Sequence, residues 1–327
     1  MKSKGQTGES FKYIFGIIVG TMFLVFFIGF AYKYMTISGQ TSDAQLANAI
    51  NDDLTAISVS QNVQNSLTYG REINFQISQG LLTPISLTTG KPLQHIIYSP
   101  KEIQTDELLT TTKTLFLPFK VTNLFYIADR NTIYILIYDQ GTQDFKDELT
   151  EGYSAIPSNI PYEVYDQQQI KNDLESLATI TKNYKHVRFI FLTQKQINPE
   201  NYFKDYSILE IKPSENTDFG TITYDDGTSI YLTKEMLIGS FLTENKQEYD
   251  YNLQQTLSKL QDITTIYYEK AKFISARLPN CEYTQIKTSL NNYKSFTNTD
   301  SHSSYENYIE TIEQANKNLG GDCPEIF

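Results

Sequence analysis

One uninterrupted apolar segment constrains the fold of this chain more than any other feature. Residues Tyr13–Tyr32 read YIFGIIVGTMFLVFFIGFAY and contain no charged side chain. At about 1.5 Å per residue, such a helix spans about 30 Å, the thickness of the hydrocarbon core of a bilayer. Lys12 and Lys33 flank the segment, and tyrosines occupy both of its ends, where interfacial aromatic residues belong. The segment therefore predicts a transmembrane helix over 13–34, in preference to a buried helix of a soluble protein.

A cleaved secretory signal is the competing interpretation of this segment. Such signals have an apolar region of about 7 to 15 residues and end at small residues in an A-x-A pattern. The segment here is longer, and the residues that follow it, Thr36-Ile37-Ser38-Gly39-Gln40, do not offer that pattern. We therefore expect the helix to be retained as an anchor.

Flanking charge predicts the orientation of the anchor. Three lysines stand before the segment, whereas the next basic residue after Lys33 is Arg71. Because lysine and arginine accumulate on the cytoplasmic side, residues 1–12 are expected in the cytoplasm and the bulk of the chain outside it. Residues 1–36 carry four lysines and one glutamate, a net charge of +3, which leaves −14 for the remainder of a chain whose net charge is −11. An acidic remainder argues against a nucleic-acid partner, since phosphate contacts need clustered lysine and arginine.

A short polar motif, Lys4-Gly5-Gln6-Thr7-Gly8-Glu9, stands directly before the apolar segment. It resembles the class III signal of archaeal type IV pilin-like proteins, in which a basic residue, glycine and glutamine precede the hydrophobic segment. The resemblance implies that a membrane peptidase cuts between Gly5 and Gln6, and that the apolar helix stays as a filament core or an anchor. Glu9 would then correspond to the acidic residue of that family, although it is fourth after the cut instead of fifth. Lys12 is a second departure, because it places a charge near the start of the helix.

Two small residues could bring copies of the anchor together. Gly16 and Gly20 form a GxxxG pair, with small residues one helical turn apart. Such pairs let two transmembrane helices approach closely, although glycine is also simply common in membrane spans. Self-association, or association with other envelope proteins, through this face is a hypothesis that the pair raises.

An amphipathic helix is predicted to follow the anchor after a hydrophilic hinge over residues 38–42. Over 43–68 the apolar residues recur at helical spacing, and Asp43 stands at the start, where a helix dipole favours an acidic residue. The apolar positions are Leu46, Ile50, Leu54, Ile57 and Val63. We expect this helix to serve as a stalk or to pack on the outer domain, as the equivalent helix of pilin-like proteins packs on a sheet.

Strand patterns dominate residues 71–243. Arg71–Ile77 alternates polar and apolar residues, as a strand with one wet face should. One hairpin is predicted from Leu124–Ile127 and Ile133–Tyr138, and another across Asp225-Asp226-Gly227, since Asp-Gly suits a tight turn. Between them, residues 167–184 have helical periodicity, and His186–Leu192 reads as a buried strand.

The sequence within 71–243 also suggests a weak internal duplication. In each half a histidine, His95 or His186, precedes an apolar strand, and each strand leads through a Lys-x-Ile segment towards a hairpin. The alternative is chance similarity between strands that are rich in tyrosine and isoleucine.

The C-terminal region, 244–327, is predicted to be helical and to contain a disulfide. An apolar stripe runs from Leu253 through Ile274, and Leu278-Pro279 ends it. Shorter helical stretches follow, and the two cysteines of the chain, Cys281 and Cys323, bracket them. Outside the cytoplasm a disulfide between these cysteines is the natural expectation, with free thiols or pairing between chains as alternatives.

Residues with recognisable chemistry are scarce. His95, His186 and His302 lie far apart in sequence, with no cysteine or second histidine at ligand spacing, so we interpret them as structural. The chain has no G-x-S-x-G, H-E-x-x-H, Walker or Rossmann motif. Asp225-Asp226-Gly227 lacks the alternating acids of a calcium loop and reads as a turn. We therefore predict no catalytic residue, metal or cofactor.

The sequence as a whole predicts an α+β protein with a transmembrane helix, a stalk helix, a mixed-sheet extracytoplasmic domain and a helical tail. The extracytoplasmic domain is either a single unit or an internal duplication. Because the N-terminus resembles that of archaeal pilin-like envelope proteins, a non-enzymatic role in surface structure, adhesion or assembly is favoured. The alternative is an anchored extracytoplasmic ligand-binding protein or hydrolase whose site residues converge only in three dimensions. The lipid bilayer is the partner that both interpretations share.

Overall fold

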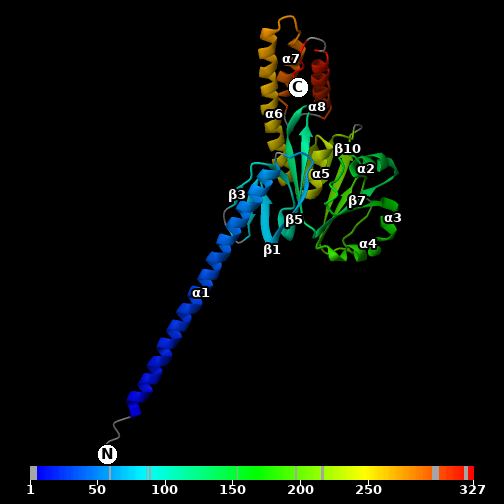
Figure 1. Ribbon diagram of the computed structural model, residues 1–327. Helices are drawn as coiled ribbons and strands as arrows, with labels where there is room; N and C mark the ends of the chain where they lie inside the picture. Colours follow the sequence, from blue (N-terminus) through cyan, green and yellow to red (C-terminus); the bar gives the residue numbers. More distant parts are fainter. Residues whose placement is uncertain are drawn as a thin grey trace, which may run out of the picture.

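The fold is described from a computed structural model of the chain. It covers residues 6–58, 60–85, 87, 90–152, 154–195, 197–214, 217–296, 302–319 and 323–327, with side chains from 17 onward except 34–42, 70–71, 172 and 302–303. The chain forms a head of two six-stranded sheets, from which the N-terminal helix projects on one side and a group of C-terminal helices on another (Figure 1).

The predicted anchor and stalk helices are one continuous helix. Helix α1 runs over Gln6–Ile57, and it continues through the residues at 38–42 where a hinge was expected. It ends eleven residues before the predicted boundary at 68, because Gln64–Ser78 forms strand β1 instead. Val63, which was assigned to the stalk helix, lies in the connection and donates its backbone N–H to Thr112 Oγ1 at 3.1 Å.

The free half of α1 exposes large apolar side chains. Among residues Ile17–Tyr32, Met22 is 75% exposed and Leu24 is 59% exposed, and Val19 alone among the large apolar side chains is half-buried. Among the residues that the structure describes, no helix combines the length and the apolar composition that crossing a membrane requires. The predicted transmembrane segment begins at Tyr13, whereas side chains are described only from Ile17 onward. The side chains at the start of that segment therefore lie outside the described part of the chain.

The first sheet, sheet A, has the strand order β3-β2-β1-β5-β6-β4 and is antiparallel except at its edge, where β4 pairs parallel with β6. A register shift between Thr68 and Ile73 interrupts the pairing of its two longest strands, β1 and β5. The remaining strands are β2 (Leu81–Pro84), β3 (Lys91–Pro92), β4 (Ile96–Tyr98), β5 (Glu102–Phe116) and β6 (Lys120–Ala128).

The end of α1 covers one face of sheet A. Ala47, Ile50 and Leu54 recur at helical spacing and are buried in one apolar cluster with side chains of the sheet. Phe125 and Ile127 of β6 point into this cluster, whereas Leu124 and Tyr126 point to the opposite face, as strand alternation requires. Sheet A is therefore buried on both sides, and it holds α1 to the head.

The second sheet, sheet B, has the order β12-β11-β10-β9-β7-β8. Strands β8, β7, β9 and β10 are parallel, and β11 and β12 form an antiparallel hairpin at one edge. Helices α3 and α4 cover one face of the sheet, packing on β7 and β9. The strands are β7 (Thr132–Tyr138), β8 (Tyr162–Asp166), β9 (His186–Phe191), β10 (Tyr206–Pro213), β11 (Gly220–Tyr224) and β12 (Gly227–Tyr231); the helices are α2 (Gln143–Thr150), α3 (Gln167–Asn172) and α4 (Leu174–Ile180).

One buried helix joins the two sheets. Helix α5 (Lys234–Leu242) begins at Thr233, whose side chain accepts a hydrogen bond from Met236 N, and every residue from Met236 to Leu242 is buried. The Tyr126 hydroxyl of sheet A donates to the Glu235 carbonyl oxygen at 2.6 Å. The main apolar cluster surrounds α5 and includes the inner faces of both sheets.

The C-terminal region is helical, as predicted. Helix α6 (Lys246–Arg277) packs on sheet A, and α7 (Thr284–Tyr293) and α8 (His302–Lys317) pack beside it (Figure 1). Cys281 and Cys323 form a disulfide that closes this region.

Two expectations about the sheets are wrong. Leu124–Ile127 and Ile133–Tyr138 do not form a hairpin, because β6 belongs to sheet A and β7 pairs parallel with β8 and β9 in sheet B. The Asp129 carboxylate accepts hydrogen bonds from Asn131 N and Thr132 N, both at 2.9 Å, and so fixes the turn that carries the chain from one sheet to the other. The two sheets also differ in strand order and direction, so the two halves are not copies of one unit.

Candidate functional site

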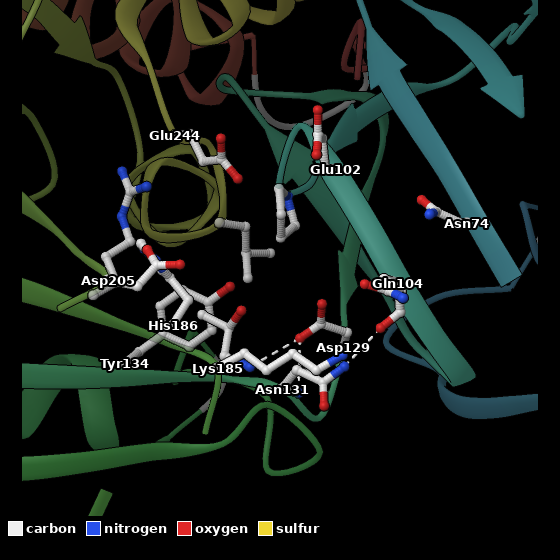
Figure 2. Close-up of a pocket in the computed structure, with 14 residues that line it drawn as sticks. Asn74, Glu102, Gln104, Asp129, Asn131, Tyr134, Lys185, His186, Asp205 and Glu244 are labelled. Atoms are coloured by element: carbon white, nitrogen blue, oxygen red, sulfur yellow. Dashed lines mark hydrogen bonds and ion pairs between the residues drawn. The ribbon is translucent and has the colours of Figure 1, made fainter. Parts of the chain in front are cut away.

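A cleft opens between the two sheets, at the end of sheet B where its parallel strands begin. Its volume is about 330 Å³, within the range of small-molecule sites. Figure 2 shows labelled side chains of sheet A and of sheet B facing this space from opposite sides. The lining residues are Asn74, Pro100, Glu102, Gln104, Asp129, Asn131, Thr132, Tyr134, Lys185, His186, Arg188, Asp205, Leu242 and Glu244.

Strand register brings the sheet B residues of the cleft together. His186 is paired with Thr132 at the start of β9 and β7, and Val187 N donates to the Asp205 carbonyl at 3.2 Å where β10 begins. Ser207 is the register partner of Arg188. Because side chains alternate along a strand, His186 and Arg188 share one face of β9, and Asp205 and Ser207 share the corresponding face of β10.

His186 is the centre of a hydrogen-bonded chain of three side chains. Its Nδ1 lies 2.5 Å from Asp205 Oδ1, and its Nε2 lies 3.0 Å from the oxygen of half-buried Ser207. An ionised carboxylate only accepts hydrogen bonds, so the proton of the neutral ring is assigned to Nδ1. Nε2 then accepts the proton of the Ser207 hydroxyl. The order carboxylate, imidazole, hydroxyl is the arrangement that activates a serine nucleophile.

Arg188 is a buried cation whose hydrogen-bonding capacity is only partly used. It is 2% exposed, and one guanidinium nitrogen donates to the carbonyl oxygens of Ser240 and Thr243 at the end of α5. Within the described part of the chain, its Nε and Nη1 find no hydrogen-bond partner. Burial lowers the pKa of the guanidinium, yet arginine stays charged in proteins. These two nitrogens of a buried cation therefore lack a partner, and they have almost no exposed surface towards the cleft.

Tyr134 adds a further polar group without a partner. Its ring is buried and lines the cleft, and its hydroxyl finds no hydrogen-bond partner among the residues described. Burial raises the pKa of this hydroxyl well above its ordinary value, so it is neutral and can donate a hydrogen bond.

The charged residues of the lining are mostly acidic. Four carboxylates face or border the space, against one lysine and Arg188. Glu102 accepts from Gln76 Nε2 at 2.8 Å, and Glu244 accepts from Lys101 N at 3.2 Å. Figure 2 places Glu102 and Glu244 at one end of the cleft and Lys185 with Asn131 at the other. Such a lining disfavours a ligand with a net negative charge.

The opposite edge of sheet B, where β7 and β9 end, is the position at which open parallel sheets usually bind ligands. Asp139 stands there, and it accepts hydrogen bonds from the Thr193 hydroxyl and from Thr142 N. The bond from Thr193 is the main reason why the pKa of this carboxyl is lowered. Asp139 is therefore engaged in capping the turn that follows β7.

The residues predicted from sequence lie elsewhere. Gly5 is outside the described residues, and Gln6, Glu9 and Gly16 belong to the part of α1 whose side chains are not described. A methyl group at Gly20 would meet no atom within 4 Å, and Asp225-Asp226-Gly227 forms the β11–β12 turn.

The histidines divide in the same way. The His95 ring lies against Phe125, with centroids 4.7 Å apart, and the side chain of His302 is outside the description. His186, interpreted as structural, is the one that joins the cleft. Among the described residues, no three histidine, cysteine or acidic side chains are grouped so that they could hold a metal ion.

Sequence reasoning missed the Asp205–His186–Ser207 chain because its members come from two strand starts that are nineteen to twenty-one residues apart. The one available signal was the pair Asp205 and Ser207, two polar residues at alternate positions where a strand begins. Such pairs are common in protein sequences and do not mark a site.

The fold and the cleft define an α+β protein with two mixed sheets joined by a buried helix. No family model matches the chain, and neither a curated protein nor a solved structure matches it.

Proposed function

We propose that this chain is a single-pass membrane protein that presents its two-sheet head outside the cytoplasm in a non-enzymatic structural, adhesive or assembly role. The observation that carries the proposal is the exposure of the apolar half of α1. Met22–Ile28 are seven consecutive exposed apolar residues. Successive helical residues are about 100° apart, so this stretch is apolar on all sides. A helix that is apolar all round is normally buried, in a large protein or in a membrane.

Charge supports the orientation. The positive flank before Tyr13 favours a cytoplasmic N-terminus, and the acidic head is compatible with an exposed position beyond the membrane. The packing of Ala47, Ile50 and Leu54 on sheet A makes α1 a rigid connection between the anchor and the head.

An assembly role is supported by two features of α1. Gly20 is open to its surroundings, so a second helix could approach closely along the Gly16–Gly20 face. The sequence before the anchor resembles a pilin-like signal, and α1 packs its C-terminal end on a sheet, as the resemblance implied.

The test is N-terminal sequencing and intact mass of the native protein, followed by protease treatment of sealed, right-side-out membranes. The proposal predicts that protease digests the head while residues 13–34 of α1 stay protected, and that pilin-like processing gives a chain starting at Gln6. An unprocessed start would leave a plain anchor. A protease-resistant head would reject the orientation.

The alternative class, an anchored ligand-binding protein or hydrolase, is supported by the cleft alone. Its lining includes Asp205 and His186, and His186 is hydrogen-bonded both to Asp205 and to Ser207.

A further inference from the structure

We propose that Ser207, His186 and Asp205 form an acyl-transfer site at the edge of the cleft that His186 and Asp205 line, and that this site hydrolyses small carboxylic esters that are neutral or cationic. The inference is independent of the membrane anchor. It rests on two separate observations: the continuous chain of hydrogen bonds from Asp205 to Ser207, and the exposure of His186 where it lines the cleft.

The hydrogen-bond chain assigns a role to each side chain. Asp205 holds the imidazole in the tautomer that leaves Nε2 free to accept a proton, at 3.0 Å from the Ser207 oxygen. The His186 side chain is 26% exposed, so a substrate in the cleft can reach it. Ser207 is the nucleophile, His186 the general base, and Asp205 a positioning residue.

The reaction then proceeds in balanced steps. The Ser207 oxygen bonds to the acyl carbon, its proton passes to His186 Nε2, and the carbonyl electron pair moves onto the carbonyl oxygen. When this intermediate collapses, the ester C–O bond breaks, and the leaving alkoxide takes the proton from His186 and departs as an alcohol. Water repeats the sequence at the acyl-serine, which releases the carboxylic acid and restores Ser207.

The cleft also limits the substrate. Its volume of about 330 Å³ accommodates a small acyl compound. Glu102, Asp129 and Glu244 in the lining would repel a carboxylate-bearing substrate, so neutral and cationic esters are favoured.

The test uses the full-length chain in detergent, a fluorophosphonate probe that reacts with activated serines, and p-nitrophenyl acetate as a small neutral ester. We expect one probe molecule per chain on the peptide that contains Ser207. Ser207→Ala should abolish labelling, and His186→Gln should slow it at least about 100-fold.

Two matched controls accompany these variants. Ser158→Ala removes an exposed serine, and His95→Gln replaces a histidine outside the cleft; both should label at the rate of the unaltered chain. Circular dichroism and melting curves of Ser207→Ala and His186→Gln should match those of the unaltered chain, since both side chains are partly exposed.

Three outcomes would overturn the inference. They are an unlabelled Ser207 in a folded chain under conditions that label a known serine hydrolase, ester hydrolysis that persists in Ser207→Ala, and equal loss of labelling in the control variants. None of them would bear on whether α1 is a membrane anchor.

Discussion

The backbone of Gly239 in α5 lies directly against the ring of Tyr98 in β4. A Cβ atom at position 239 would stand 2.5 Å from Tyr98 Cγ, closer than real Cβ contacts allow. The Tyr98 ring is fully buried and packs beside Tyr126 and Tyr249, with ring centroids 6.2 and 5.8 Å away. This contact joins β4 of sheet A to α5, the buried helix between the two sheets. The relative position of the sheets, and with it the cleft, therefore depends on a residue without a side chain.

Replacing Gly239 should therefore loosen the joint. Because the neighbouring rings leave Tyr98 no room to move, Gly239→Ala should lower the free energy of unfolding by about 1–3 kcal/mol, as overpacked cores do. Urea denaturation followed by tyrosine fluorescence measures this change. Gly141→Ala is the matched control, since the nearest atom to its added methyl group, Asp139 Oδ1, is 3.4 Å away. Equal midpoints for the two variants would contradict the packing described.

The docking of α1 on sheet A makes a second prediction. Leu54 is fully buried between the helix and the sheet, so Leu54→Ala should cost about 2–5 kcal/mol through lost burial and a residual cavity. The exposed neighbour Asp52 serves as the control, and Asp52→Ala should change the free energy of unfolding little. Limited proteolysis near residue 58 reports the release of α1 directly. Similar cleavage of both variants would show that α1 is not held by this contact.

The disulfide should stabilise the C-terminal helices chiefly by restricting the unfolded chain. It links residues 42 apart, and the loop-entropy relation gives about 3–4 kcal/mol for a closure of that length. Replacing both Cys281 and Cys323 by serine should lower the melting temperature, and reductant should lower that of the unaltered chain to the same value. If reductant shifts the double variant as well, the effect arises elsewhere in the molecule.

His95 should make the stability of sheet A depend on pH. Burial, and then the nearby Lys259, lower the pKa of this imidazole in the folded chain below its ordinary value of about 6.5. The unfolded chain therefore binds the proton more readily, and stability is lost as the pH falls from about 7 through the folded pKa. His95→Gln removes the contribution of His95 protonation to stability. The difference in the free energy of unfolding between the variant and the unaltered chain should therefore change between pH 8 and pH 5. A constant difference would contradict the environment assigned to His95.

How far the sequence predicts this fold depends on how local each feature is. The turn at Asp225-Asp226-Gly227 and the apolar stripe of α6 depend on neighbouring residues, and both are present in the structure. The general class, α+β with a helical C-terminal region, is confirmed.

Features that depend on distant pairing were not predictable in the same way. The run Ile133–Tyr138 has the continuous apolar character of a strand buried on both faces, but the sequence does not say which strands become its neighbours. The prediction of a hairpin with β6 failed for that reason. The assembly of Asp205, His186 and Ser207 requires the parallel pairing of β9 with β10, so no local pattern marks it as a site.

The central claim, that α1 anchors the head in a membrane, is tested most directly by alkaline carbonate extraction of membranes that contain the full-length chain. Each lysine near the centre of a membrane span costs about 2.5–3.5 kcal/mol of insertion free energy, so Phe23→Lys combined with Phe27→Lys should prevent stable insertion. We predict that the unaltered chain stays in the membrane pellet and that the double variant moves to the supernatant. Recovery of the unaltered chain in the supernatant would contradict the account.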